Sequence, residues 1–242
     1  MEKTRKHWRS FVVSISIIGL LAVIPVGALA CNPPQRIVLP NQTEFGMTSG
    51  DWAAAWWQWA LTFTNTNNPV LELTGEKCGS GQGDGPVFFL AGAGTTDPVT
   101  RTKCIVPFGK AIVFPILSGE CSNVELPPFY GSNERELRVC VAKIIDGVDL
   151  STLKVTIDGI RVHGLKAFRA QSPVFGFTVP SEDNYFGMPG VTSGMSVADG
   201  YWVMVEPLSP GKHTIHFEAA LTSPPAPFSF SQNVTYHLTV AK

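Results

Sequence analysis

The sequence has few of the residue patterns from which an activity can be recognised. Its 18 basic and 19 acidic side chains are nearly balanced, and they form no cluster of Lys and Arg of the kind that nucleic-acid phosphates require. Cysteine pairs with CxxC spacing are absent, and no His lies at ligand spacing from a Cys, which argues against a metal site. The glycine-rich stretches do not continue into the Lys-Ser or Lys-Thr of a phosphate loop. We therefore predict no metal, no cofactor and no nucleic-acid partner.

Long apolar runs are equally scarce, and one stands out at the N-terminus. Four basic residues precede an apolar run from Phe11 to Val26, which is shorter than the ~20 residues that a membrane-spanning helix needs. The tripeptide Ala28-Leu29-Ala30 then has small residues at its first and third positions. This three-part pattern predicts a secretory signal peptide over residues 1–30. No later segment is apolar enough to cross a bilayer, so we expect no transmembrane segment in the mature chain.

Cys31 directly follows the predicted cleavage site, and two interpretations of it remain open. A lipoprotein signal also ends on a cysteine, which is then acylated, but it prefers Leu three residues earlier, where this chain has Ala28. The spacing favours ordinary cleavage, whereas the odd number of cysteines favours a lipid anchor at Cys31. In either case we expect an exported protein, in the periplasm or the extracellular space.

The other four cysteines form an even set, and in an oxidising compartment such a set predicts two disulfides. Four cysteines allow three connectivities. We favour the local pairs Cys78–Cys104 and Cys121–Cys140, each of which would contribute on the order of 3 kcal/mol by closing its loop. Zinc is the alternative, and the absence of a CxxC pair argues against it.

Two helices are predicted from their start signals. Thr48 and Asp51 have the spacing of a capping box, and Asn133 and Glu136 repeat it before the second helix. The second helix has a single apolar stripe, which consists of Leu137, Cys140, Val141, Ile144 and Ile145. Because Cys140 lies on that stripe, we expect it to be structural rather than reactive.

The rest of the chain is organised as short strands. We predict that residues 31–46 form an irregular lead-in. Residues 47–242 are enough for one domain with a full core. The pair Asp158-Gly159 between two apolar runs is a strong hairpin signal. Alternating runs continue to the C-terminus at Val174–Val179, Tyr201–Val205, His213–Ala219 and Val234–Val240. This pattern predicts a mainly β domain, an antiparallel β-sandwich or jelly roll with two packed helices.

Several segments resemble a group of exported bacterial proteins without an assigned activity. They are Trp56-Trp57-Gln58-Trp59, Gly85-Pro86-Val87-Phe88-Phe89-Leu90-Ala91-Gly92, Glu120-Cys121-Ser122 and Pro210-Gly211-Lys212-His213-Thr214-Ile215-His216-Phe217. The resemblance extends over nearly all of the mature chain. It implies a single exported domain and assigns no catalytic residue.

A cluster of tryptophans is the first candidate site. Trp52, Trp56 and Trp59 share one face of the first predicted helix, and Trp57 lies roughly opposite them. Aromatic rings can form a platform for sugar rings or other planar ligands. A helix that is apolar on two faces is also what burial between two layers requires, and we favour the core interpretation. If one ring is exposed, we expect it to be Trp57.

A second candidate consists of His216, His237 and Glu218. Strand alternation places all three on the non-core face of what we expect to be neighbouring strands, where they could bind a ligand or transfer a proton. Solvated surface histidines are the commoner outcome. Carboxylates that could pair in space for glycoside hydrolysis are also available, and none carries a local motif: Asp51, Glu120, Glu125, Asp183, Asp199 and Glu206.

Three functions remain open from the sequence. The first is a non-catalytic exported binding or surface protein whose ligand is a glycan or another small molecule. The second is a secreted hydrolase or lyase that acts on polysaccharide, and the third is a structural envelope protein. A concave site where two carboxylates converge would favour the enzyme, and an exposed aromatic platform without such a pair would favour the binding protein.

Overall fold

A computed structural model describes residues 36–242, so the predicted signal peptide and Cys31 lie outside the described residues. The helices are α1 (Ser49–Leu61) and α2 (Glu134–Ile145), with short 3₁₀ helices η1 (Asn65–Asn67) and η2 (Leu165–Phe168). The strands are β1 (Val87–Phe89), β2 (Val99–Pro107), β3 (Ala111–Ser122), β4 (Lys154–Ile157), β5 (Ile160–Arg161), β6 (Arg169–Gln171), β7 (Phe175–Thr178), β8 (Ser193–Val205), β9 (Gly211–Leu221) and β10 (Phe230–Ala241).

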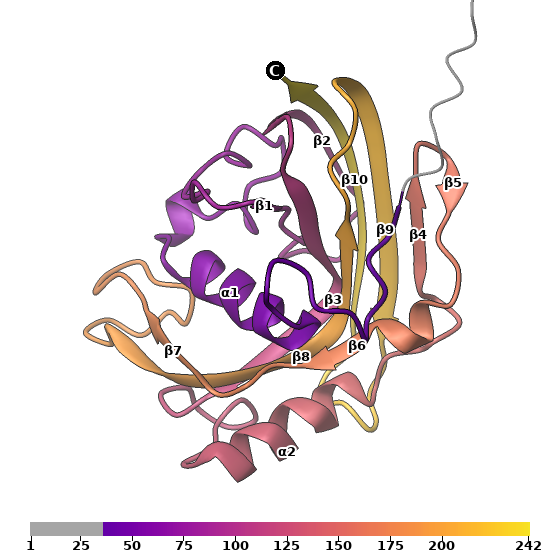
Figure 1. Cartoon of the computed structure of the whole chain (residues 1–242). Coiled ribbons are helices and arrows are strands. Elements are labelled where there is room, and N and C mark those ends of the chain that lie inside the picture. The colour runs from indigo at the N-terminus through magenta and orange to yellow at the C-terminus, as the bar shows by residue number, and fades with distance from the viewer. Residues whose placement is uncertain (1–35) are drawn as a thin grey trace, which may run out of the picture. The chain divides into compact units, whose positions relative to one another are not determined.

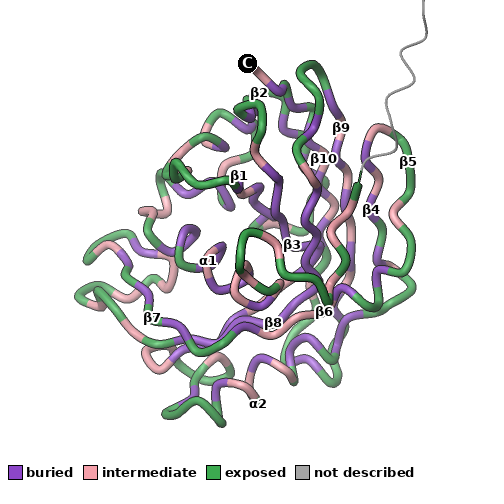
Figure 2. The backbone as a smooth tube through the Cα atoms, viewed as in Figure 1, coloured by how far each residue is buried: buried purple, intermediate pink, exposed green. Residues whose placement is uncertain are grey.

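The strands form two sheets that share one core. The first sheet has the order β1-β3-β8-β6, and β7 also pairs with β8, while the second has the order β2-β10-β9-β4-β5. Side chains from both sheets meet between them, where the rings of Phe114 and Phe217 stack with centroids 4.9 Å apart. Figure 2 shows buried residues concentrated along β3, β8, β9 and β10. The predicted class, mainly β with two packed helices in a single domain, is confirmed.

Each sheet contains one parallel pair, which differs from the predicted antiparallel sandwich. Strands β1 and β3 run parallel, and so do β2 and β10. The chain leaves the first sheet after β1, forms β2 in the second sheet and returns as β3, so that β1 and β3 run in the same direction. The alternation of apolar and polar residues along a strand cannot distinguish parallel from antiparallel pairing, because side chains alternate between the two faces in both kinds of sheet.

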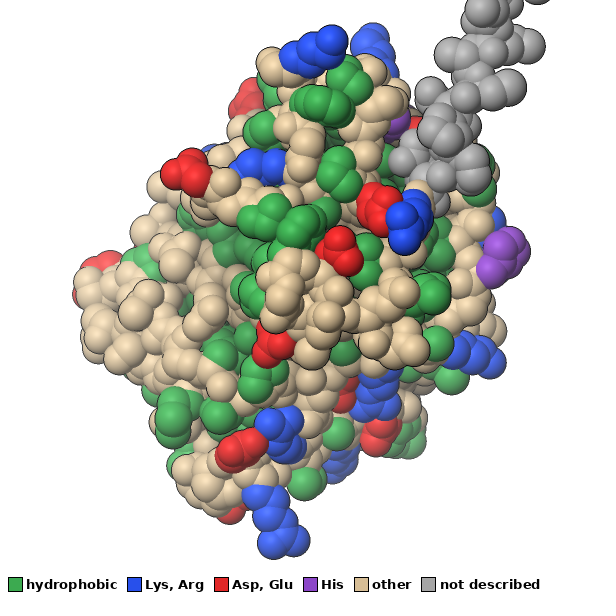
Figure 3. Space-filling view, in the orientation of Figure 1, with side chains coloured by type: hydrophobic (Ala, Val, Ile, Leu, Met, Phe, Trp, Pro, Cys, Tyr) green, Lys and Arg blue, Asp and Glu red, His purple; other side chains and the backbone are tan. Residues whose placement is uncertain are grey.

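The two helices cover opposite faces of the first sheet. Helix α1 lies inside the curve of this sheet and α2 lies outside it (Figure 1). The capping box of α1 is confirmed, since Thr48 and Asp51 form both of its hydrogen bonds. At α2 only half of the predicted box forms, because Asn133 accepts from the Glu136 N–H but the Glu136 carboxylate accepts from the Ser132 N–H. On the face shown in Figure 3, charged side chains lie scattered, without a large patch of one sign.

Both predicted disulfides are present. Cys78–Cys104 joins the loop before β1 to β2, and Cys121–Cys140 joins the end of β3 to α2. Bonds of this kind persist in oxidising compartments. Within residues 36–242, no helix combines the length and the apolar character that crossing a bilayer demands.

The predicted hairpin is also confirmed. Strands β4 and β5 are joined by Asp158 and Gly159, which both have positive φ angles, 51° and 78°, as a type I′ turn requires. The Asp158 carboxylate accepts a hydrogen bond from the Thr214 N–H at 2.8 Å. It also lies 2.7 Å from Nδ1 of the buried His213, which attaches the turn to β9.

Candidate ligand-binding cavity

The tryptophan helix is buried, as the core interpretation predicted. Trp56 and Trp59 donate from their indole nitrogens to the carbonyls of Leu90 and Ser80, at 2.9 and 3.0 Å. Trp52 is half-buried and donates to the Glu44 carbonyl at 3.2 Å. These indoles therefore anchor loops to α1 instead of forming an exposed platform.

The expectation that Trp57 would be the exposed ring is wrong, because only 6% of this residue is exposed. Its ring packs edge-on against Trp56 and Tyr185, with centroids 5.3 and 6.0 Å away. The chain segment before β8 supplies Tyr185 and covers the helix face that periodicity alone leaves open. Among the tryptophans of α1, only Trp57 has a buried Nε1–H without a hydrogen-bond partner among residues 36–242. The Trp202 indole of β8 is also unpartnered, but Trp202 does not line the cavity described next.

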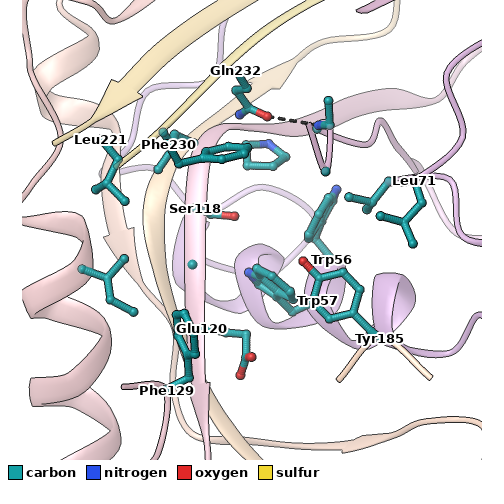
Figure 4. A pocket seen from close by; sticks show the side chains of 18 of the residues that line it. Trp56, Trp57, Leu71, Ser118, Glu120, Phe129, Tyr185, Leu221, Phe230 and Gln232 are labelled. Carbon is teal, nitrogen blue, oxygen red and sulfur yellow. Dashed lines mark hydrogen bonds between the residues drawn. The ribbon is translucent and has the colours of Figure 1, made fainter. Parts of the chain in front are cut away.

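Trp57 forms part of the wall of a cavity of about 610 Å³. Figure 4 shows Trp56, Trp57 and Tyr185 on one side of this cavity and Ser118 and Glu120 of β3 on the other. Its other walls come from the segment between η1 and β1, the loop after β1, the loop after β3, α2, the end of β9, the loop before β10 and β10 itself. They include Val70, Leu71, Gly92, Ala93, Glu125, Phe129, Ile144, Leu221, Phe228, Phe230 and Gln232.

The cavity exists because β3 is longer than its neighbour β1. On one side β3 pairs with β8 over almost its full length, and on the other side it pairs with β1 only as far as Val113. Beyond that point the free edge of β3 faces the cavity. Gln232 crosses the gap, since its amide donates to the Ile116 carbonyl and accepts from the Ala93 N–H at 3.1 Å (Figure 4).

Two carboxyl groups meet at the β3 wall. Glu120 is 5% exposed, and its side chain shares a hydrogen bond with that of Glu125, which follows in the next loop. Burial, and then the charge of Glu125, hold the pKa of Glu120 well above its usual range. Burial also raises the pKa of Glu125, although hydrogen bonds from Glu120 and Ser122 oppose the shift. Two carboxyls in such contact require a shared proton.

Two hydroxyl groups lie beside the pair. The Ser196 hydroxyl donates to a Glu120 carboxyl oxygen and also contacts the Cys121 carbonyl, the latter at 2.8 Å. Its hydrogen bond opposes part of the rise in the pKa of Glu120, but burial and the charge of Glu125 outweigh it. Burial, followed by the charges of Glu120 and Glu125, raises the pKa of the Tyr185 phenol to about 12. The phenol therefore stays protonated beside the pair.

A buried arginine shapes the opposite rim of the cavity. Arg101 on β2 is 1% exposed, and its guanidinium lies 5.1 Å from the centre of the Tyr236 ring. It donates to the Tyr236 hydroxyl and to five carbonyls, those of Pro69, Val70, Glu72, Ala91 and Gly92. The two loops that carry these carbonyls supply Val70, Leu71, Gly92 and Ala93 to the cavity wall.

The second predicted cluster lies elsewhere, on the outer face of the second sheet. His216 and His237 are on the neighbouring strands β9 and β10, as expected, but each ring nitrogen contacts a threonine across the strand pair, at 3.0 and 3.1 Å. Glu218 forms an ion pair with Lys154, and its carboxylate is 3.8 Å from His216. Within residues 36–242 no group of three or more potential metal ligands is found.

Among the candidate carboxylates, the structure brings only Glu120 and Glu125 together. The other four have partners outside the cavity: Asp51 caps α1, Asp183 accepts from Thr66, Asp199 pairs with Arg169, and Glu206 pairs with Arg36. The sequence offers one signal that could have singled out Glu120: it is the one charged residue of β3 and lies near the end of that strand. Nothing local in the sequence marks Ser118, Tyr185 or Arg101.

Comparisons with known proteins add little to this geometry. No family model matches the chain, and no curated protein matches it. The solution structure of Amebosin aligns with 64% of this chain and 100% of its own, at 10% sequence identity and a TM-score of 0.17. A similarity this low carries no argument about fold or function, and the resemblance to exported bacterial proteins stays a prediction.

Proposed function

We propose that this protein is an exported binding protein that holds a small, partly apolar ligand in the cavity between α1 and β3. The observation that carries the proposal is the Trp57 indole. A buried N–H without an acceptor destabilises a folded protein by about 1–3 kcal/mol, and this one belongs to a residue of the cavity wall. An acceptor atom on a bound ligand would supply the missing partner.

The size and lining of the cavity support the same function. Ligand sites commonly measure ~300–1,000 Å³ and combine an apolar wall with a few polar groups, and this cavity measures about 610 Å³. Its polar groups include the Glu120–Glu125 pair, the Ser118 hydroxyl and the Tyr185 phenol. Because the tryptophans are buried, a compact ligand fits the site better than a glycan chain bound on an open platform.

Export is the second part of the proposal. The N-terminal pattern over residues 1–30 is that of a signal peptide, and the two disulfides suit an oxidising compartment. A periplasmic or extracellular protein fits both observations. Acylation of Cys31 would in addition hold it at a membrane surface.

One observation favours an alternative, a secreted acid–base hydrolase. The paired carboxyls at the cavity wall match the catalytic requirement stated above, but they share a hydrogen bond. They are therefore closer than the ~5–5.5 Å or ~6.5–9.5 Å of glycosidase pairs. A proton-sharing pair is instead the arrangement of aspartic proteases. Incubation of the protein with casein tests this alternative, and turnover that is lost in Glu120→Gln would establish it.

The binding function is tested with a fragment library and ligand-observed NMR. Ser118 points into the cavity (Figure 4), so Ser118→Phe should fill it and abolish the binding of fragments that the wild-type protein retains. Ser181→Phe, on an exposed loop, introduces the same ring elsewhere and should leave binding unchanged. If wild-type protein binds no fragment, or if Ser118→Phe binds all of them equally well, the proposal is wrong.

A further inference from the structure

The polar wall of the cavity has acidic groups without a basic partner. None of the ion pairs among residues 36–242 involves Glu120 or Glu125. The residues that line the cavity include no Lys, Arg or His. The groups that face the carboxyl pair from the surrounding elements are Trp57 of α1, Ser122 of β3, Ser196 of β8 and Tyr185 of the segment before β8. The positive charge that would balance an ionised pair is therefore missing from the described protein.

Aromatic rings make up much of the remaining wall. Six aromatic side chains line the cavity: Trp56, Trp57, Phe129, Tyr185, Phe228 and Phe230. The faces of aromatic rings attract cations, most strongly where water is excluded, and cages of such rings are a recurring protein site for quaternary ammonium groups. A neutral apolar ligand would match the rings but would leave the buried carboxyls without a complement.

We propose that the ligand is a small organic cation, an inference that rests on the binding function proposed above. It would be a protonated or quaternary amine whose positive group lies against Glu120 and Glu125 and whose apolar body contacts the aromatic wall. An acceptor atom on that body would pair with the Trp57 indole. This assignment accounts together for the acidic pair without counter-charge, the aromatic lining and the unpartnered N–H.

Binding would exchange one positive charge for another. Burial and the charge of Glu125 raise the pKa of Glu120, so the pair in the empty cavity would keep a proton at pH values where an ordinary Glu has lost it. When the ammonium group enters, that proton leaves to solvent and the ionised carboxylate pairs with the cation. Affinity should therefore rise with pH until the pair is fully ionised in the empty protein. Tyr185 does not interfere, because its phenol stays protonated over that range.

The test compares two probes of similar size, phenethylamine, which is a cation at neutral pH, and phenethyl alcohol, which is neutral. We expect the amine to bind the wild-type protein about 10–100-fold more tightly, the range that a charge-assisted hydrogen bond gives. Calorimetry in two buffers with different ionisation enthalpies should show a proton released by the amine and none by the alcohol. Benzyltrimethylammonium, whose charge does not titrate, should show the same rise of affinity with pH.

The variants Glu120→Gln and Glu125→Gln separate charge from shape. Each should remove most of the preference for the amine and leave the affinity for the alcohol within about twofold, since Gln keeps the volume of Glu. Glu182→Gln changes an exposed carboxylate and should change neither affinity. Near-UV circular dichroism of each variant verifies that the fold is retained.

The outcomes distinguish this inference from the binding function on which it rests. If both probes bind equally well, and Ser118→Phe blocks both, the cavity binds ligands but the cationic class is wrong. If the preference for the amine survives in both Gln variants, the carboxyl pair is not its origin and the inference fails. If neither probe binds while the fragment library does, a small amine is excluded. If no compound binds, the binding function itself fails.

Discussion

Arg101 and Glu120 are both almost completely buried ionisable residues, yet their surroundings differ in kind. The Arg101 guanidinium donates to five carbonyls and one phenol, so the protein itself meets its hydrogen-bonding capacity. Glu120 faces another carboxyl and a cavity, with no positive group nearby. A buried charge with saturated contacts indicates a structural role. One with unbalanced contacts indicates that something outside the described protein completes it.

The same contrast separates two neighbouring tryptophans. Trp56 and Trp57 are adjacent on α1 and are equally buried, but the Trp56 indole has a carbonyl partner and the Trp57 indole has none. Arg101 and Trp56 hold loops that form the cavity. Glu120, Trp56 and Trp57 lie on its wall, and among these three only the Trp57 indole lacks a hydrogen-bond partner.

The largest expected effect on stability comes from replacing Arg101. Arg101→Met fills similar volume but leaves the carbonyls of two loops without a donor, and each buried group left unpaired destabilises by about 1–3 kcal/mol. Some of them will reach water, so we expect the free energy of unfolding to fall by about 3–5 kcal/mol in urea denaturation. Arg161→Met, at an exposed position of β5, should change it by less than about 0.5 kcal/mol. A small effect at Arg101 would contradict its structural role.

A matched pair of variants compares the contribution of each tryptophan to stability. Trp56→Phe and Trp57→Phe leave similar voids, but only the first leaves the Leu90 carbonyl without its donor. We expect Trp56→Phe to lower the free energy of unfolding by about 1–2 kcal/mol more than Trp57→Phe. Thermal and urea denaturation measure the difference directly. Equal losses in both variants would mean that the Trp57 N–H is satisfied in the folded protein.

The smallest expected effect is a pH dependence of stability. Because the folded protein raises the pKa values of Glu120 and Glu125, it keeps protons that the unfolded chain releases above its glutamate pKa of about 4.3. Between that value and the higher pKa of the folded pair, the free energy of unfolding should fall as pH rises. The slope is at most about 1.4 kcal/mol per pH unit for each such proton.

Glu120→Gln isolates this slope from other titrations. The variant should flatten the decline, and its stability should exceed that of the wild-type protein at the alkaline end of the window. Carboxylates whose pKa is lowered by hydrogen bonds, such as Asp51 and Asp183, lose their stabilisation only as pH falls below their ordinary range, so they act outside the window. Urea denaturation between pH 4.5 and 8 tests this, and identical slopes in the two proteins would contradict the shared-proton pair.

Local signals predicted the parts of the fold that depend on neighbouring residues. The capping box at Thr48, the Asn133 cap and the Asp158-Gly159 turn all appear where the sequence placed them. The local cysteine pairing also holds, because closing a short loop is entropically easier than joining distant segments. Strand directions were not predictable in this way, and each sheet contains a parallel pair.

The candidate site was predicted only in part. Trp56 and Trp57 were selected as aromatic candidates and line the cavity, but the choice of Trp57 as the exposed ring failed because Tyr185 covers it. Glu120 and Glu125 were available carboxylates without a motif to join them. They meet because Glu120 lies near the end of β3, where one edge of this strand is free, and Glu125 lies in the loop that directly follows the strand.

By itself, the sequence determined where the two helices begin, where the Asp158-Gly159 turn lies and that the local cysteine pairs are favoured, since these depend on contacts within a few turns or one short loop. It did not determine the bounds of the strands, since β8 begins at Ser193 and the alternating run was predicted from Tyr201. The tertiary structure decided which charges and indoles find partners. That outcome depends on segments far apart in the chain, Tyr185 against Trp57 and Arg101 against the loops at Pro69 and Ala91. Hydrogen-bond saturation is a property of the packed whole, and it distinguishes the Trp57 indole, which has no partner, from those of Trp52, Trp56 and Trp59, which each have one.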